Sequence, residues 1–179
     1  MDIPTLKTHT PFDRSPGRGL ILSLLGASTI VGAVAAALVS PAALAAVFMV
    51  ACATDVTFAW GTGPRDGVVW RVIVAILYFA AGYVVVGHPS WSVPALSIVV
   101  SATLLIEATL TLMLYFASEG ASPWILLSGM ATAGVATLTA GHLSLSLRVI
   151  VGAVGANLLV GGFASLASWM ESERLTEPR

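Results

Sequence analysis

The stretch WRVIVAILYFAAGYVVVGHPSWSVPALSIVVSATLLIEATLTLMLY, residues 70–115, decides the fold of this chain. Two apolar runs, 70–87 and 93–116, are separated by the break GHPSW at 87–91. Each run is close to the roughly 20 apolar residues that cross a bilayer as a helix. The stretch therefore predicts a hairpin of two transmembrane helices, with one acid, Glu107, inside the second helix.

The composition extends this prediction to the whole chain. Of 179 residues, 57 % are hydrophobic and 9 % are charged, whereas about a quarter of residues are charged in soluble domains. No Asp, Glu, Lys or Arg occurs in 19–54, 72–106, 120–147 or 149–170. The first two of these segments are too long for one span each and suit two helices joined by a turn. We therefore expect an all-α integral membrane protein in contact with the lipid bilayer.

Proline, glycine and charge divide the chain into six expected spans. Proline ends a helix before it and suits the first turn of the next one. The expected spans are 19–39, 41–60, 70–87, 93–116, 123–140 and 143–169. They form a single membrane domain, 18–170, between a disordered cytoplasmic arm, 1–17, and a charged cytoplasmic tail, 171–179.

The basic residues predict how the spans are oriented. The side of the two termini carries Lys7, Arg14, Arg18, Arg65, Arg71, Arg174 and Arg179, and the opposite side carries only Arg148. Positive charge is retained in the cytoplasm, so both termini are expected there.

An internal repeat groups the spans into three tandem helical hairpins, at about 18–62, 68–117 and 122–170. A polar residue recurs within the second helix of each hairpin: Asp55, Glu107 and Asn157, at spacings of 52 and 50 residues. Each lies 14 residues after the expected start of its helix, which is about 21 Å at 1.5 Å per residue. We expect these three side chains at similar depth.

Tandem apolar hairpins with small residues in the odd helices and a polar position in the even helices resemble the HdeD family of bacterial inner-membrane proteins. The segments that carry the resemblance are 24–44, 77–107 and 126–162. The resemblance implies a multi-pass, non-enzymatic protein of the bacterial inner (plasma) membrane that acts in acid-stress resistance.

Glu107 is the first candidate for a functional site, because a carboxyl group is costly in lipid and usually faces a bundle interior, a cavity or a partner. One reading is proton or cation handling, or contact with a ligand. The other is a structural hydrogen bond between helices, with Asn157, Asp55 or a neighbouring hydroxyl, worth about 0.6–2 kcal/mol.

Asp55 lies near the cytoplasmic end of its span, and Asn157, which does not titrate, is expected to be structural. No basic residue is expected inside a span at this depth, so an internal salt bridge to these acids is not predicted.

His88 and His142 occupy equivalent outer turns, each after a glycine. Histidine can change its charge near physiological pH, so these side chains are candidate sensors of acid on the outer face; the alternative is two solvated turn residues. Two histidines without a third ligand do not predict a metal site.

Small residues one turn apart predict close helix packing, within the chain or between copies. The candidate pairs are Gly129 with Ala133, Gly152 with Ala156, and Ala33 with Ala37. No catalytic triad, phosphate loop or dinucleotide fingerprint is present, so no enzyme activity and no cofactor is predicted. A net charge of −1 offers no basic stripe for a nucleic-acid partner.

Three functions follow from these features. The first is an HdeD-like role in acid or envelope stress, in which protonation of Glu107 and Asp55, or of His88 and His142, shifts helix packing. The second is a small transporter or channel for protons or a solute, which internal repeats and polar residues at mid-membrane depth suit. The third is a homo-oligomeric scaffold or a subunit that binds another membrane protein.

Overall fold

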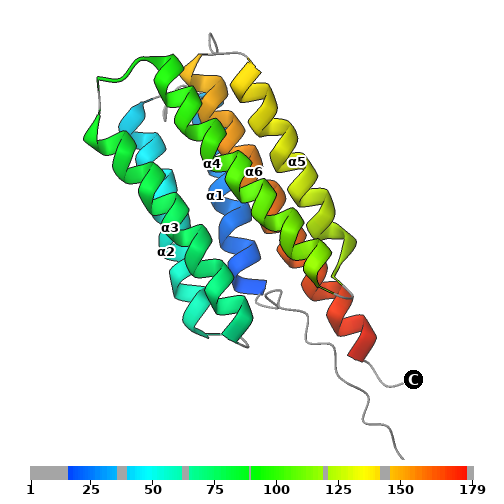
Figure 1. The fold of residues 1–179 in the computed structure, drawn as a ribbon. Helices are drawn as coiled ribbons and strands as arrows, with labels where there is room; N and C mark the ends of the chain where they lie inside the picture. The colour runs from blue at the N-terminus through cyan, green and yellow to red at the C-terminus, as the bar shows by residue number, and fades with distance from the viewer. Residues whose placement is uncertain are drawn as a thin grey trace, which may run out of the picture.

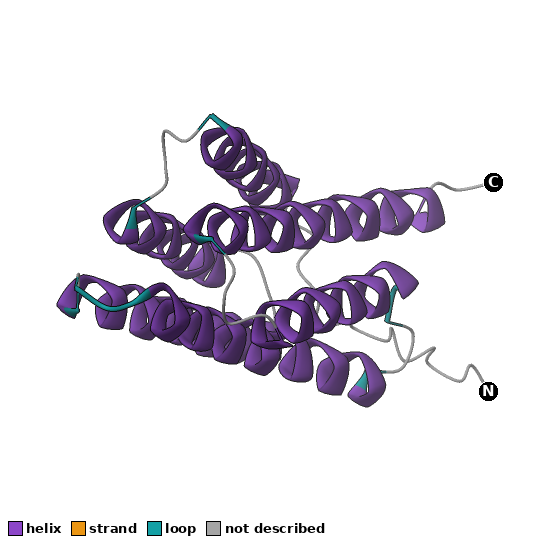
Figure 2. Cartoon of the chain, turned by 90° about the horizontal axis from the view of Figure 1, so that it is seen from above, coloured by secondary structure: helices purple, strands orange, loops and turns teal. Residues whose placement is uncertain are grey.

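The computed structural model describes residues 16–35, 40–61, 65–88, 90–118, 121–141 and 146–176. Within these ranges the chain consists of helices and short connections, without a strand (Figure 1, Figure 2). The helices are α1 (Pro16–Val34), α2 (Pro41–Gly61), α3 (Arg65–Gly87), α4 (Val93–Ala117), α5 (Pro123–Gly141) and α6 (Leu147–Thr176). All six are long and apolar enough to cross a membrane. The structure thus confirms an all-α fold with six candidate membrane spans.

Five helix boundaries differ from the predicted ones by three residues or more. Two of them are the end of α1 at Val34, which was expected at residue 39, and the start of α6 at Leu147, which was expected at residue 143. Helix α1 begins at Pro16, inside the expected arm, and proline is tolerated there because the first amides of a helix need no partner within it. Helix α3 begins at Arg65, inside the expected loop. Helix α6 continues to Thr176, into the expected tail. Residues 1–15, 36–39, 142–145 and 177–179 lie outside the described ranges.

A serine before a proline of the first turn marks the start of two even helices; the serine side chain caps α2 but not α4. The Ser40 hydroxyl accepts a hydrogen bond from the Ala43 amide at 3.0 Å, which satisfies one of the free amides at the start of α2. Ser92 is the N-cap of α4 in an extended backbone conformation, with proline in the first turn. Proline is tolerated in the first turn of a helix but breaks a helix in its interior. A new helix therefore starts at each of these positions.

The helix contacts form a closed ring. Each helix contacts the next one along the chain, and α1 contacts α6. The most extensive contacts join α1 to α6, α2 to α3, and α4 to α5 (Figure 1). Relative to the repeats expected from the sequence, each of these three pairs joins an odd helix of one repeat to an even helix of another. The helices alternate in direction, so α1 begins and α6 ends at one end of the bundle, which we call the terminal end. The end that carries His88 is the opposite end.

Glycines bring α1 and α6 into direct backbone contact. Gly19 lies against Gly162, and Gly26 lies against Gly155, so the two pairs are spaced seven residues apart on antiparallel helices. A Cβ atom on Gly19 would lie 2.9 Å from the Gly162 carbonyl oxygen, and one on Gly155 would lie 3.0 Å from the Gly26 carbonyl oxygen. Such contact is favourable in lipid, where van der Waals packing drives helix association.

Large apolar side chains lie both inside and outside the bundle. Phe48, Val100, Leu104 and Ile150 are fully buried in the core. Many others are exposed, for example Val34, Phe116 and Leu138, which are each more than 60 % accessible. An apolar outer surface of this kind is what a lipid environment requires.

We expect Gly162→Ala to destabilise the bundle by about 1–3 kcal/mol, because the added methyl group overpacks the contact between α1 and α6. Its Cβ would lie 2.7 Å from the Gly19 carbonyl oxygen and still closer to Ser23. The control is Gly152→Ala on the same helix, where a Cβ has no neighbour within 4 Å. Thermal unfolding in detergent checks both variants. Equal melting temperatures for the two would contradict the proposed contact.

Candidate functional site

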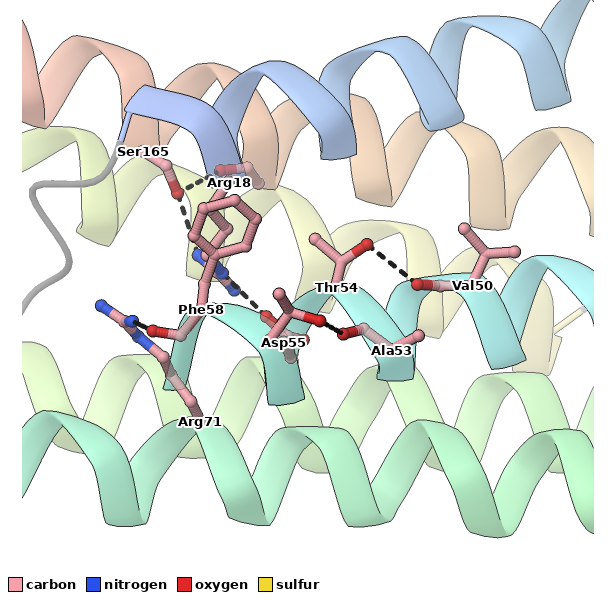
Figure 3. A network of polar contacts seen from close by, with 10 residues as sticks. Arg18, Val50, Ala53, Thr54, Asp55, Phe58, Arg71 and Ser165 are labelled. Atoms are coloured by element: carbon pink, nitrogen blue, oxygen red, sulfur yellow. Dashed lines mark hydrogen bonds and ion pairs between the residues drawn. The ribbon is translucent and has the colours of Figure 1, made fainter. Parts of the chain in front are cut away.

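A buried ion pair joins the first turn of α1 to α2. The Arg18 Nε atom donates to Asp55 Oδ1 at 2.7 Å. The Arg18 Nη1 atom donates to Ser165 Oγ at 3.0 Å, so one guanidinium of α1 contacts both α2 and α6 (Figure 3). The Asp55 side chain is fully buried, whereas 19 % of the Arg18 side chain is accessible. Asp55 therefore depends on Arg18 for neutralisation of its charge.

This ion pair shows that the predicted absence of an internal salt bridge was wrong. Arg18 belongs to the first turn of α1, and Asp55 lies six residues before the end of α2. Because these helices are antiparallel, the start of α1 lies beside the end of α2. Asp55 is then about 9 Å inside the helix end at 1.5 Å per residue, a distance that a long arginine side chain can cover by extending along the helix. The distance of Arg18 from the start of α1 and that of Asp55 from the end of α2 together predict the pair.

A second polar group centres on Glu107. The Asn157 Nδ2 atom donates to Glu107 Oε2 at 2.9 Å, and the Thr132 hydroxyl donates to Asn157 Oδ1. The Tyr78 hydroxyl also hydrogen-bonds with the Glu107 carboxyl group. The Asn157 amide thus presents its nitrogen to an acceptor and its oxygen to a donor. Together these bonds link α3, α4, α5 and α6 through neutral partners.

Glu107 borders a cavity of about 100 Å³. It is partly accessible, whereas Tyr78, Thr132 and Asn157 are buried. The other polar or charged groups on the cavity wall are Arg18, Trp70, Arg71, Thr111, Ser128, Ser165 and Ser168. In the same measure one water occupies about 10–15 Å³, so the cavity has room for several waters. Glu107 therefore borders a small cavity whose wall combines polar and apolar side chains.

Arg71 supports the same end of the bundle. Its side chain is 7 % accessible, and its Nη1 atom donates to the Phe58 carbonyl oxygen (Figure 3). Phe58 is among the last four residues of α2, whose carbonyl groups have no partner within the helix. A cation at this position also complements the helix dipole. Arg71 therefore caps α2 from α3.

Asp55 is the less completely satisfied of the two acids. Its Oδ2 atom is buried without a hydrogen-bond partner in the described chain. A buried polar atom in this state costs roughly 1–3 kcal/mol. Asp55 and Glu107 are close enough to repel each other electrostatically, and Arg18 attracts both. The two acids therefore belong to one charged region, although no direct hydrogen bond between them is observed.

The structure brings some of the predicted site residues together and keeps others apart. Glu107 and Asn157 are in contact, as one of the alternatives from the sequence required, whereas Asp55 pairs with Arg18. His88 is exposed at the opposite end; its Nδ1 atom lies 3.1 Å from the Val84 carbonyl oxygen and its ring stacks on Trp91 at 4.4 Å. His142 lies outside the described residues.

The small-residue candidates lie in different environments. Gly129 faces Leu112 across the α4–α5 contact, where a Cβ would lie 3.0 Å from that side chain. Gly152 has open space at the same position, and Ala133 and Ala156 are half-buried. Ala33 is buried, while Ala37 lies outside the described part of the chain. The backbones of α1 and α6 meet at glycines that are seven residues apart on each helix. This spacing differs from that of the predicted pairs, which are four residues apart.

Among the described residues, no group of three or more His, Cys, Asp or Glu side chains is arranged to hold a metal ion. Comparison with protein-family models, with curated proteins and with solved structures finds no match to the chain. The fold and the site therefore define it as a multi-pass α-helical membrane protein with a small cavity beside a partly buried glutamate.

We expect Arg18→Leu to destabilise the protein by about 3–5 kcal/mol, since it leaves the Asp55 carboxylate buried without its counter-ion. Unfolding in detergent measures the loss. Arg148→Leu is the matched control, because Arg148 occupies the start of α6 and is exposed. The double variant Arg18→Leu/Asp55→Leu should recover much of the loss. Normal stability of Arg18→Leu alone would show that the ion pair is not needed.

Proposed function

We propose that this protein is a non-enzymatic, HdeD-like component of acid or envelope stress resistance, and that protonation of Glu107 changes its helix packing. The observation that supports the proposal is the position of Glu107. Its carboxyl group borders a cavity with polar and charged residues on its wall and is hydrogen-bonded to Asn157 of α6 and Tyr78 of α3. One titratable group is thereby in contact with two neighbouring helices.

Protonation would act through the hydrogen bonds of Glu107. An ionised carboxylate only accepts hydrogen bonds, which suits the Asn157 amide and the Tyr78 hydroxyl. A protonated carboxyl group carries a donor of its own and, being neutral, accepts hydrogen bonds more weakly, so protonation weakens the bonds from Asn157 and Tyr78. Hydrogen bonds between membrane helices are each worth about 0.6–2 kcal/mol, and a change of 1.4 kcal/mol shifts an equilibrium about tenfold. The resulting shift is large enough to change which helix arrangement predominates.

The finer topology is part of this proposal. We place both termini in the cytoplasm and the protein in a bacterial inner membrane, with three tandem hairpins. The distribution of basic residues supports the orientation. The threefold recurrence of an odd helix packed on an even helix, in α1–α6, α2–α3 and α4–α5, is what three equivalent repeats would produce.

The cavity itself favours a second candidate, a small transporter or channel. A polar cavity inside a bundle, with charged residues on its wall, is a common feature of solute pathways. Proteoliposome flux of protons at pH 5 and pH 7 separates the two candidates. Flux that is lost in Glu107→Gln supports transport, and the absence of flux in the native protein supports the stress-response role.

We expect Glu107→Gln to abolish any acid-survival phenotype without lowering the amount of protein in the membrane. Glutamine keeps an acceptor for Asn157 but cannot take up a proton in this pH range. Survival after acid challenge, in a host that depends on the protein, is the measurement. His88→Gln is the control, because it removes a titratable group at the opposite end; loss of survival in that variant alone would assign acid sensing to His88. Unchanged survival of Glu107→Gln would disprove the role of Glu107.

A further inference from the structure

The cavity extends from Glu107 in one direction only. Its wall is formed by the first halves of α1 and α5 and by segment 70–78 of α3, helices that begin at the terminal end, and by segments 107–114 of α4 and 157–168 of α6, helices that finish there. On α4, for example, the lining residues are Glu107, Thr111 and Leu114, which follow one another toward the terminal end. Every lining residue therefore lies at the level of Glu107 or on its terminal side.

Toward the opposite end, the bundle is closed by apolar packing. Val100 and Leu104 on α4, and Ile150, Val151 and Val154 on α6, are at most 1 % accessible and belong to one core cluster. Phe48 of α2 is fully buried in the same cluster. These six side chains lie on the side of Glu107 that faces the opposite end, and none of them carries a polar group that could hold water.

The buried hydroxyl groups in that half do not supply an alternative route. Ser101, Thr103, Thr29 and Thr139 each donate to a backbone carbonyl of their own helix. Ser97 donates to the Thr139 carbonyl oxygen across the α4–α5 contact at 2.9 Å. A hydroxyl group has one hydrogen to donate, and these five are already used by backbone oxygens.

The charged and titratable groups around Glu107 also lie at the terminal half. Helix α1 contributes Arg18, α2 contributes Asp55 with Cys52 one turn away, and α3 contributes Tyr78 and Arg71. Helices α5 and α6 contribute only hydroxyl and amide groups there, from Ser128, Thr132, Asn157, Ser165 and Ser168. In the described parts of the helices, 19–34, 41–54, 72–87, 93–106 and 149–156 contain no Asp, Glu, Lys or Arg.

The geometry points to one-sided access: water and protons reach Glu107 from the terminal end through the cavity, and not from the opposite end. The inference rests on the proposed function, in which Glu107 is the group that takes up the proton. It adds that the protein responds to the pH of the compartment that contains its termini. With the proposed orientation this compartment is the cytoplasm, so external acid would act only after the cytoplasm has acidified.

Cysteine accessibility in intact membranes tests this inference. Cys52 is the only cysteine, so Cys52→Ser provides a background for single substitutions. Glu107→Cys is exposed to a charged, membrane-impermeant thiol reagent in spheroplasts and in inverted vesicles, and protease cleavage of a C-terminal tag identifies the side of the termini. We expect labelling from that side alone. Leu104→Cys, in the dry core, should be labelled from neither side.

A matched pair of glycine variants tests the route itself. Gly161 lines the cavity, and Gly152 lies on the same helix outside it; a Cβ on either has no neighbour within 4 Å. Gly161→Leu should fill the cavity and abolish the labelling of Glu107→Cys. Gly152→Leu should leave the labelling unchanged. If Glu107→Cys does not accumulate in the membrane, Thr111→Cys, one turn nearer the terminal end, replaces it with the same expected pattern.

The outcomes separate this inference from the proposed function. Labelling from the opposite side, from both sides or from neither side, or equal labelling in the two glycine variants, would overturn one-sided access. One-sided labelling together with unchanged acid survival of Glu107→Gln would retain the access route and reject the proposed function. Labelling from the opposite side with loss of survival would reject only the route.

Discussion

A carboxylate inside a membrane bundle must be neutralised or solvated, and the arrangement of this protein depends on how that requirement is met. Asp55 is fully buried and is paired with Arg18 at 2.7 Å. This pair holds the start of α1 beside the end of α2, while the same guanidinium reaches Ser165 on α6. Glu107 is partly accessible and is held by neutral donors beside a cavity. Asp55 is thus neutralised by a cation, whereas Glu107 is stabilised by hydrogen bonds beside a cavity.

The ion pair and the glycine contact support each other. Gly19 follows Arg18 directly and lets α1 approach the Gly162 backbone of α6. Without this close approach, the Arg18 side chain would lie farther from Ser165. The α1–α6 contact also closes the ring of helices, so it sets the distance across the cavity from α1 to α4. A local choice of glycine on two helices therefore controls the shape of a site whose central residue lies on a third.

The helices were predictable from the sequence because charge-free runs, prolines and glycines act locally. The Ser40-Pro41 start of α2 and the Pro123 start of α5 are examples. The contact between Glu107 and Asn157 was predictable as one alternative, because equal spacing suggested equal depth. The Arg18–Asp55 pair was missed because residues near helix ends were treated as external, although a long side chain reaches inward. Tyr78 and Thr132 were missed because a tyrosine or a threonine in an apolar run carries no pattern that distinguishes a hydrogen-bonding partner from core.

The difference between the two acids supports the proposal that Glu107, rather than Asp55, is the group that takes up a proton. Asp55 is held by an ion pair with Arg18, and this pair links α1 to α2. Protonation of Glu107 removes no ion pair; it exchanges one pattern of hydrogen bonds with Asn157 and Tyr78 for another. It also ends the repulsion from Asp55. The ion pair therefore keeps the framework in place, and the neutral partners leave Glu107 free to change its protonation state within it.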